Sequence, residues 1–382
     1  MIANKTLRHA HGHLLVVRPP TPVTVNKAGA NYKSEVKHLE YSPRRAFDEW
    51  TKICETVLDC GGDALFQFEE VDEPFLGSKR LAVHGDGSIT VEGSKEALGN
   101  ISSIQTGRVF TANGPWVVVN EDTLTAVLPN MLAHRKSEKP YYVSIAKELA
   151  QASNKEAKIV ENPHRWEGMA DVAMVGDQVV LTYAVPGHYD EGLAPKSKRS
   201  SREGVSFAAD HAGVPEDARI YVELIYPHFH GDTVHFGARP KGAPSVLVHY
   251  SKGLWGDGAE TVANALRAKI VQISKDDAVE QYAGNSRQVN DGVLVPDGVS
   301  DEYIKSVNAL GLETKKVPLF ELFGKAGGGP GCATLYLPDN LNLPPDHPWR
   351  YSNQRGGVAK RREKLAESVT VSPEFFAEKQ RG

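Results

Sequence analysis

Cysteine is scarce in this chain. Only three cysteines, Cys54, Cys60 and Cys332, occur among 382 residues. Three thiols cannot form the disulfide framework that stabilises small secreted domains. We therefore expect a protein of a reducing compartment.

Long apolar runs and an excess of one charge are also missing. No run approaches the roughly 18 apolar residues that a membrane span requires. The first residues lack the apolar segment and cleavage site of a signal peptide, so we expect a cytoplasmic protein. The 44 Lys and Arg residues nearly balance the 48 Asp and Glu residues, which gives a net charge of −4. Such a balance is not typical of proteins that bind nucleic acid or anionic membranes, so we expect neither partner.

Short apolar runs recur along the chain, and helical patterns lie between several of them. Segment 42–61 begins with Ser42 as a potential N-cap, ends on a glycine, and carries apolar residues at three- and four-residue spacing from Ala46 to Val57. Residues 85–90 (GDGSIT) predict a hairpin turn. Alternating strands and helices favour an α/β fold class. Further helices are predicted at 137–153, 259–269 and 300–312, and strands at 14–17, 64–68, 116–119, 173–185, 219–226, 245–250, 269–273 and 292–297.

The chain shows no internal boundary before its last forty residues. No Gly/Ser linker or change of composition divides residues 8–340, so we predict one domain there. Residues 341–382 are rich in Pro, Lys, Arg and Glu. We expect them to form a polar C-terminal extension, with KRREKLAES (360–368) as a solvated helix.

A glycine-rich segment leads directly into Cys332. In AGGGPGCATLYLP (326–338), four glycines and a proline precede this thiol, and a strand-like run follows. Glycines let the backbone approach a ligand closely, and a thiol of lowered pKa in such a loop is a nucleophile. The alternative is a flexible loop followed by a buried cysteine that only packs.

Histidines alternate with other residues in IYPHFHGDTVHFG (225–237). His228, His230 and Asp232 imitate the start of an HxHxD metal motif, but Thr233 stands where that motif has its next histidine. The rival interpretation is a Cys/His enzyme in which one histidine is general acid and base. A second alternation near the N-terminus, His9/His11/His13, is more typical of surface histidines than of a metal site.

Two further segments carry polar residues in tight turns. In HRWEGMADV (164–172), Glu167 and Asp171 frame a Gly-Met-Ala turn, so both carboxylates can reach one pocket. In RVFTANGPWVVV (108–119), Asn113 precedes Gly114, Pro115 and a strand-like run. Either segment taken alone is equally well an ordinary surface loop.

Taken in order, these segments resemble the guanidino-group-modifying superfamily of dimethylargininases, arginine deiminases, arginine dihydrolases and amidinotransferases. The resemblance covers about residues 12–338 and leaves the tail uncovered. LLVVRPPTP is similar to the family's opening, and AGNSRQVNDGVLVPDG to the segment about forty residues before its nucleophile. The other matching motifs are FTANGPW, WEGMAD, HGDT and AGGGPGCATL.

The resemblance implies a role for each motif. Cys332 is the implied nucleophile, His230 the general acid and base, and Glu167 the group that orients His230. Neither a metal nor a cofactor is implied. The implied substrate-binding residues are Asp232 and Asn113, with Asp171, and Arg199 or Arg202 for a substrate carboxylate.

The implied fold is a five-bladed, pseudo-symmetric α/β propeller. Three features depart from the family pattern. Asn113 replaces the aspartate of arginine deiminases, Ala170 replaces a glycine, and segment 76–107 is longer. Asparagine at this position resembles the dihydrolase branch of the superfamily. It also suits an enzyme whose substrate is a substituted guanidine.

The expected function is hydrolysis of the guanidino group of arginine or an arginine derivative, through a covalent Cys332 thioether. Three alternatives stay open: an amidinotransferase with an amine acceptor, a metal-dependent hydrolase that uses the HxHxD-like residues, and a protein that only binds a guanidino ligand. The expected partner is a small guanidino compound, and a homo-oligomer is left open.

Overall fold

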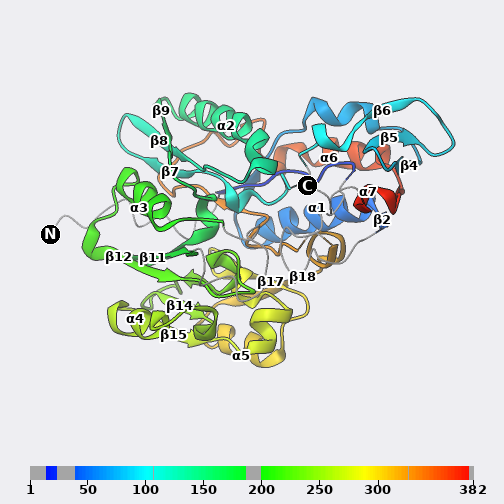
Figure 1. Ribbon diagram of the computed structural model, residues 1–382. Coiled ribbons are helices and arrows are strands. Elements are labelled where there is room, and N and C mark those ends of the chain that lie inside the picture. The colour runs from blue at the N-terminus through cyan, green and yellow to red at the C-terminus, as the bar shows by residue number, and fades with distance from the viewer. Residues whose placement is uncertain (1–13, 24–38, 106, 186–198, 326, 378–382) are drawn as a thin grey trace.

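The computed structural model describes residues 14–23, 39–105, 107–185, 199–325 and 327–377. Helices and strands alternate along these ranges, so the predicted α/β class is confirmed (Figure 1). Residues 8–13 of the predicted domain, and with them His9, His11 and His13, lie outside the described residues.

Five sheets of three strands share one pairing pattern. In each, the middle strand pairs antiparallel with one neighbour and parallel with the other. Among the described residues these pairings leave the sheets separate and close none of them into a ring. The sheets are β19 (Leu335–Tyr336), β1 (Leu14–Val16) and β3 (Asp63–Leu65); β7 (Trp116–Val119), β8 (Thr123–Leu128) and β9 (Glu156–Glu161); β10 (Val172–Val175), β11 (Gln178–Tyr183) and β12 (Arg219–Glu223); β13 (His235–Ala238), β14 (Val246–His249) and β15 (Lys269–Gln272); β16 (Arg287–Val289), β17 (Gly292–Pro296) and β18 (Glu313–Val317).

The local signals in the sequence explain most of these elements. Helix α1 (Pro43–Asp59) begins after Ser42, whose side chain accepts a hydrogen bond from the Arg45 amide, as an N-cap does. The predicted run 173–185 is two strands instead of one, because Gly176 adopts φ +68° and turns the chain between β10 and β11. The remaining helices are α2 (Lys139–Ala152), α3 (Arg202–His211), α4 (Gly258–Ala265), α5 (Asp301–Asn308), α6 (Tyr351–Lys364) and α7 (Glu374–Ala377).

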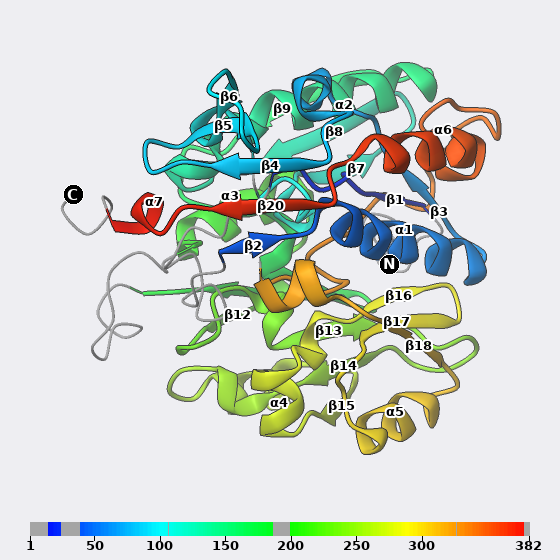
Figure 2. The ribbon, with the colours of Figure 1, turned by 90° about the vertical axis from the view of Figure 1, so that its right-hand side faces the viewer.

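A sixth sheet joins the C-terminal tail to the rest of the molecule. Its order is β2 (Glu40–Tyr41), β20 (Ser368–Val371), β4 (Arg80–Val83), β5 (Ser88–Val91) and β6 (Ala97–Asn100). Figure 2 shows β20 between β2 and β4, close to α1. The turn predicted at residues 85–90 lies between β4 and β5, with Gly87 at φ +83°.

The tail is therefore not an appendage. Tyr351, Leu365 and Val369 are buried in the same apolar cluster as Trp50 of α1. The expectation of a solvated extension fails because the tail's few apolar residues are spaced to face α1 and the sixth sheet, while most of its charges, with the exception of buried Arg361, stay outside. The composition of the tail reveals its many charges but not which of its residues are buried.

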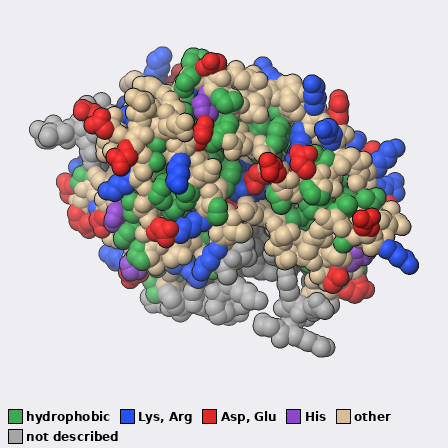
Figure 3. Space-filling model, turned by 90° about the horizontal axis from the view of Figure 1, so that it is seen from above, with side chains coloured by type: hydrophobic (Ala, Val, Ile, Leu, Met, Phe, Trp, Pro, Cys, Tyr) green, Lys and Arg blue, Asp and Glu red, His purple; other side chains and the backbone are tan. Residues whose placement is uncertain are grey.

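The surface carries mixed charge. On the face shown in Figure 3, acidic and basic side chains lie next to one another. Within the described ranges, no helix combines the length and apolar character needed to cross a bilayer.

Replacing Leu365 with alanine tests whether the tail belongs to the core. Leu365 is 3% exposed, so truncating it leaves a cavity, and we expect the free energy of unfolding to fall by about 2–5 kcal/mol. Denaturant unfolding measures the loss. Lys364→Ala, one residue earlier and exposed, is the control and should stay within about 0.5 kcal/mol of wild type. Equal stability of the two variants would contradict the packing of the tail.

Candidate active site

In every three-stranded sheet, the outer strand that pairs antiparallel with the middle strand is preceded by a short segment with a polar residue. These residues form the candidate site. These segments are short 3₁₀ turns before four of the sheets and the glycine-rich loop before the fifth. The turns are Thr111–Asn113 before β7, Gly168–Asp171 before β10, Gly231–Thr233 before β13 and Ala283–Asn285 before β16, and Cys332 precedes β19. Four of these five segments hold a predicted site residue each (Asn113, Asp171, Asp232 and Cys332), and Glu167 and His230 immediately precede two of the turns.

Cys332 is buried next to a carboxylate and an amide. Its Sγ lies 3.3 Å from Oδ2 of Asp232 and 3.1 Å from Nδ2 of Asn285. Burial raises the pKa of the Cys332 thiol well above its usual value, and the Asp232 charge raises it further. The resting form is thus a thiol that donates to Asp232.

Glu167 is fully buried and contacts His230. With its proton on Nε2, His230 donates to Oε2 of Glu167 over 3.1 Å. Nη1 of Arg199 donates to the same oxygen over 2.8 Å, and the Leu132 amide donates to Oε1 over 2.9 Å. Burial alone would raise the pKa of Glu167, but Arg199 and then His230 hold it well below its usual range. Glu167 is therefore an anion that fixes the orientation of the imidazole.

Asn113 joins this group through both ends of its amide. Nδ2 donates to the main-chain oxygen of Glu167 over 2.9 Å and lies 3.4 Å from Nε2 of His230. Oδ1 accepts a hydrogen bond from Nη1 of Arg135. Arg135 is itself buried and donates from Nε to Oε1 of Glu138 over 2.7 Å. The oxygen of Asn113 is thus already engaged by a cation of the protein.

Asp171 lies in the group, but its carboxylate faces protein donors. Oδ1 accepts from the Gly231 amide and from the Thr182 hydroxyl, each over 2.9 Å, and Oδ2 accepts from the Ser200 hydroxyl. These contacts fix the turn that carries His230. Both carboxylate oxygens of Asp171 therefore accept hydrogen bonds from the protein, and its contact with a substrate stays a prediction.

The two arginines that the resemblance implies for a substrate carboxylate have different surroundings. Arg199 is 5% exposed and pairs with Glu167, whereas Arg202 is exposed at the start of α3. The Arg202 guanidinium lies over the Tyr221 ring, 5.1 Å from its centroid. The structure brings Arg199 into the group and leaves Arg202 outside it.

A glycine in the WEGMAD segment allows two turns to touch. Gly168 has φ +83°, and a Cβ placed there would lie 2.3 Å from the Gly114 oxygen and 2.4 Å from the Asn113 carbonyl. The position therefore excludes any larger side chain. Ala170, which replaces a glycine of the family pattern, is buried without displacing Asp171 from its three donors.

The residues of the HxHxD-like pattern face different partners. Nδ1 of His228 contacts the Thr233 hydroxyl at 3.2 Å, His230 contacts Glu167, and Asp232 contacts Cys332. Across the part of the chain that the structure describes, no three His, Cys, Asp or Glu side chains are arranged to hold a metal ion.

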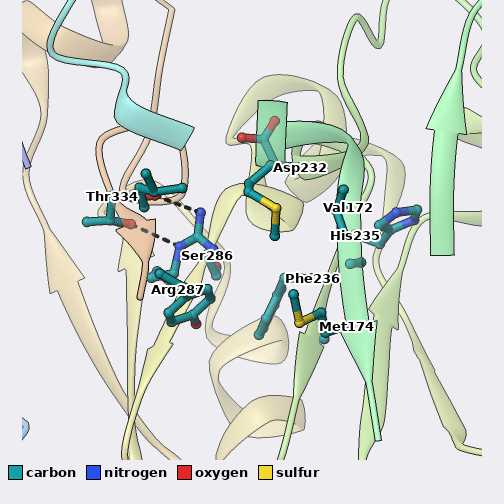
Figure 4. Close-up of a pocket in the computed structure, with 13 residues that line it drawn as sticks. Val172, Met174, Asp232, His235, Phe236, Ser286, Arg287 and Thr334 are labelled. Atoms are coloured by element: carbon teal, nitrogen blue, oxygen red, sulfur yellow. Dashed lines mark hydrogen bonds between the residues drawn. The ribbon is translucent and has the colours of Figure 1, made fainter. Parts of the chain in front are cut away.

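A small cavity of about 40 Å³ touches the site through Asp232 (Figure 4). On its other side, Arg287 donates from Nε to the Thr334 hydroxyl over 2.9 Å and from Nη2 to the Gly331 oxygen over 2.6 Å. Arg287 thus anchors the loop of Cys332 from the side opposite Asp232.

Sequence reasoning missed two polar residues of the site. Arg135 contacts Asn113, and its only local signal is the spacing to Glu138, which is typical of any helix surface. Asn285 contacts Cys332 and lies within AGNSRQV, a segment that we matched to the family without assigning a role to the asparagine.

Replacing Arg199 with methionine tests the Glu167 ion pair. A carboxylate with a lowered pKa stabilises the fold above its unfolded pKa, near 4.5, and loses that contribution as the pH falls. We expect a loss of about 3–5 kcal/mol of unfolding free energy at pH 7, because a buried charge loses its main partner. The difference from wild type should shrink between pH 7 and pH 4 as Glu167 is protonated in the variant. Denaturant unfolding at several pH values measures it, and the exposed Arg202→Met is the matched control. A pH-independent loss would contradict the pair.

No family model matches the sequence, and no curated protein sequence matches it either. Solved structures do match. The N-terminal domain of ArgZ, described as an arginine dihydrolase of the ornithine–ammonia cycle in cyanobacteria, aligns with a TM-score of 0.62 at 20% identity and covers 86% of this chain and 99% of that domain. Another structure of that domain carries a covalently bound reaction intermediate.

Two other enzymes align over a similar range. AgrE in complex with ornithine and NAD⁺ aligns with a TM-score of 0.58 at 19% identity, over 87% of this chain and 39% of AgrE. A dimethylarginine dimethylaminohydrolase adduct aligns at 0.53 and 15% identity, over 86% of this chain and 100% of that one. This chain spans 41% of the length of intact ArgZ. The chain therefore has the fold of the guanidino-modifying, or pentein, superfamily.

Proposed function

We propose that the protein hydrolyses the guanidino group of arginine or an arginine derivative through a covalent Cys332 thioether. One observation carries the proposal: the thiol of Cys332 and the carboxylate of Asp232 are in contact, and Asp232 belongs to the same turn as the glutamate-bound His230. The shared fold with the ArgZ domain, one structure of which holds a covalent intermediate, supports the same chemistry.

Asp232 is suited to bind a cation. Within the described part of the chain, its Oδ1 is a buried atom with no hydrogen-bond partner. Burying a carboxylate oxygen without a donor is unfavourable, and a guanidinium N–H would satisfy it. Binding would place the guanidinium carbon near Sγ, which contacts the other oxygen of the same carboxylate.

The cation would also activate the nucleophile. Asp232 and burial disfavour the Cys332 thiolate in the free enzyme. A guanidinium held between the two groups screens the carboxylate and favours the thiolate, so the thiol gives its proton to Nδ1 of His230 when the substrate is present. The thiolate then adds to the guanidinium carbon.

We assign the proton transfers of the reaction to His230. With Nε2–H held by Glu167, its Nδ1 is the nitrogen that exchanges a proton with the reacting groups. It passes the proton taken from the thiol to the departing nitrogen, whose bond to the carbon breaks, and an amidino thioether remains on Cys332. It then takes a proton from water, the hydroxyl adds to the same carbon, and the thiolate leaves as the ureido product forms.

Asn113 sets this site apart from one with two carboxylates. Its side chain is a neutral amide, so it adds no negative charge around the guanidinium. The oxygen of that amide already accepts a hydrogen bond from Arg135. An arginine dihydrolase or an enzyme for a substituted guanidine is consistent with that arrangement, and the likeness to ArgZ supports the first.

We also propose that the five three-stranded sheets are the blades of a propeller. Their common pairing pattern and the polar residue before each antiparallel edge strand support a repeated unit around one pocket.

Replacing Cys332 with alanine should abolish turnover, and replacing His230 with alanine should lower it by about 10²–10⁴-fold. The measurement is release of ammonia, urea and ureido products from a panel of guanidino compounds, with and without amine acceptors. Cys60→Ala is the matched control and should keep its activity, because Cys60 lies at the end of α1. Full activity of Cys332→Ala would contradict the mechanism, and product that appears only with an amine acceptor would indicate an amidinotransferase.

Replacing Asp232 with asparagine should raise KM sharply, because the guanidinium loses its anionic partner. The same change should lower the pKa of the Cys332 thiol, because a carboxylate beside the sulfur is removed. Steady-state kinetics and the pH dependence of Cys332 alkylation measure the two effects. An unchanged KM would remove the guanidinium-binding role.

A further inference from the structure

We propose that Asn285 is a catalytic residue that stabilises the Cys332 thiolate through its side-chain N–H. This inference rests on the proposed function, in which Cys332 is the nucleophile. No part of the family resemblance gave this asparagine a role, and the structure places it against the reacting atom.

The contact is direct and buried. Nδ2 of Asn285 lies 3.1 Å from Sγ of Cys332, and the asparagine has no exposed surface. The second N–H of the same amide points to the main-chain oxygen of Asp232, also 3.1 Å away. One uncharged group therefore contacts both the nucleophile and the turn that carries the guanidinium-binding carboxylate.

The orientation of the amide is fixed by the nucleophile loop itself. Oδ1 of Asn285 accepts a hydrogen bond from the Cys332 amide over 2.9 Å, so the N–H₂ end must face the sulfur. The Gly331 amide donates to the main-chain oxygen of Asn285 over 2.8 Å. The donor is thus held in position before any substrate arrives, which is the condition for electrostatic stabilisation at low reorganisation cost.

The glycines before Cys332 make room for this asparagine. A Cβ at Gly329 would lie 2.8 Å from Oδ1 of Asn285, and one at Gly331 would lie 2.9 Å from its main-chain oxygen. The glycine-rich sequence is therefore explained in part by close packing of the loop on Asn285.

The charges around the sulfur show what the amide contributes. Burial and the Asp232 carboxylate both disfavour a thiolate, and the N–H of Asn285 opposes them. Arg287, the nearby cation, directs its hydrogen bonds to Thr334 and to the Gly331 oxygen. A neutral donor stabilises the thiolate without repelling a cationic substrate, as an additional positive charge would.

Position in the fold supports the same assignment. Asn285 ends the 3₁₀ turn before β16, the place that Asn113 has before β7 and that Cys332 has before β19. The sheet β16–β17–β18 would otherwise be the one three-stranded sheet without a residue in the site.

Two substitutions test the proposal. Asn285→Ala removes the donor without adding charge, and Asn285→Asp keeps an acceptor for the Cys332 amide while removing the donor. We expect both to slow iodoacetamide alkylation of Cys332 in the free enzyme by about 10- to 100-fold at a fixed pH near neutrality, and to shift its pH dependence upward. Peptide mass mapping separates Cys332 from the other two cysteines. For each substrate that wild type turns over, kcat should fall by a similar factor and recover as the pH rises.

The control is the same pair of changes at Asn290, whose side chain donates to the Cys60 oxygen instead. Thermal unfolding of all variants reports any loss of folding. The new carboxylate of Asn285→Asp disfavours the thiolate by itself, so Asn285→Ala carries the test: a purely structural role predicts that folded Asn285→Ala alkylates with the wild-type rate and pH dependence. That result, or an effect of the aspartate without one of the alanine, would overturn the donor role. Because alkylation needs no substrate, it tests Asn285 even if every guanidino compound fails as a substrate.

Discussion

The buried carboxylate of Glu167 is the constraint on which the site depends. An ionised carboxylate without solvent is costly unless donors surround it, and here those donors come from separate parts of the chain. Arg199 precedes α3, His230 precedes β13, and the Leu132 amide lies between β8 and α2. The main-chain oxygen of the same glutamate holds Asn113. The sheets therefore have to meet in one arrangement before the charge is satisfied. Correct folding and a correctly oriented imidazole are in that sense one event, because the groups that neutralise Glu167 also position His230.

The same rule extends outward to the C-terminal tail. Asn113 accepts from Arg135, and beyond Arg135 acidic and basic side chains, all buried except the half-buried Glu69, alternate until they reach Arg361 in α6. None of the inner members can lose its partner without leaving a charge in a poorly solvated place. Arg361 of the tail thus gives Asp72 a second cationic partner beside Arg108 and ends a network that begins at the site, which helps to explain why so polar a segment is packed against the core. From the site outward, the network runs through Arg135, Glu138, Arg18, Glu69, Arg108, Asp72 and Arg361, each paired with the next.

The sequence predicted best those features whose interacting residues lie close together along the chain. Helix α1 was predictable because Ser42 caps an amide three residues away and the apolar spacing repeats within the helix. The motif order also predicted which turns lie together, including those of Cys332, His230 and Glu167. Asn285 could not be recognised from its neighbours, because its partner lies 47 residues later and only the fold brings them together. Arg202 was indistinguishable from Arg199 in sequence, because the two lie only three residues apart. In the structure Arg199 precedes α3 and pairs with Glu167, whereas Arg202 begins α3 and lies over the ring of Tyr221 in β12. The packing of the tail was not predicted, because its composition is an average over the whole segment. Its contact with the core depends on a few apolar positions that this average hides.

The environment of Cys332 combines one unfavourable charge with one favourable dipole. In the proposed mechanism, a site with Asp232 but without Asn285 would hold less thiolate, and the nucleophile would be weaker. If it contained a cation in place of Asn285, the thiolate would persist in the free enzyme and react with any electrophile, and the guanidinium would be repelled. In the proposed mechanism, an acid that disfavours the thiolate and an amide that supports it together make activation depend on the arrival of a positive charge. Selectivity for cationic substrates then follows from the protonation state of the nucleophile as well as from the shape of the pocket.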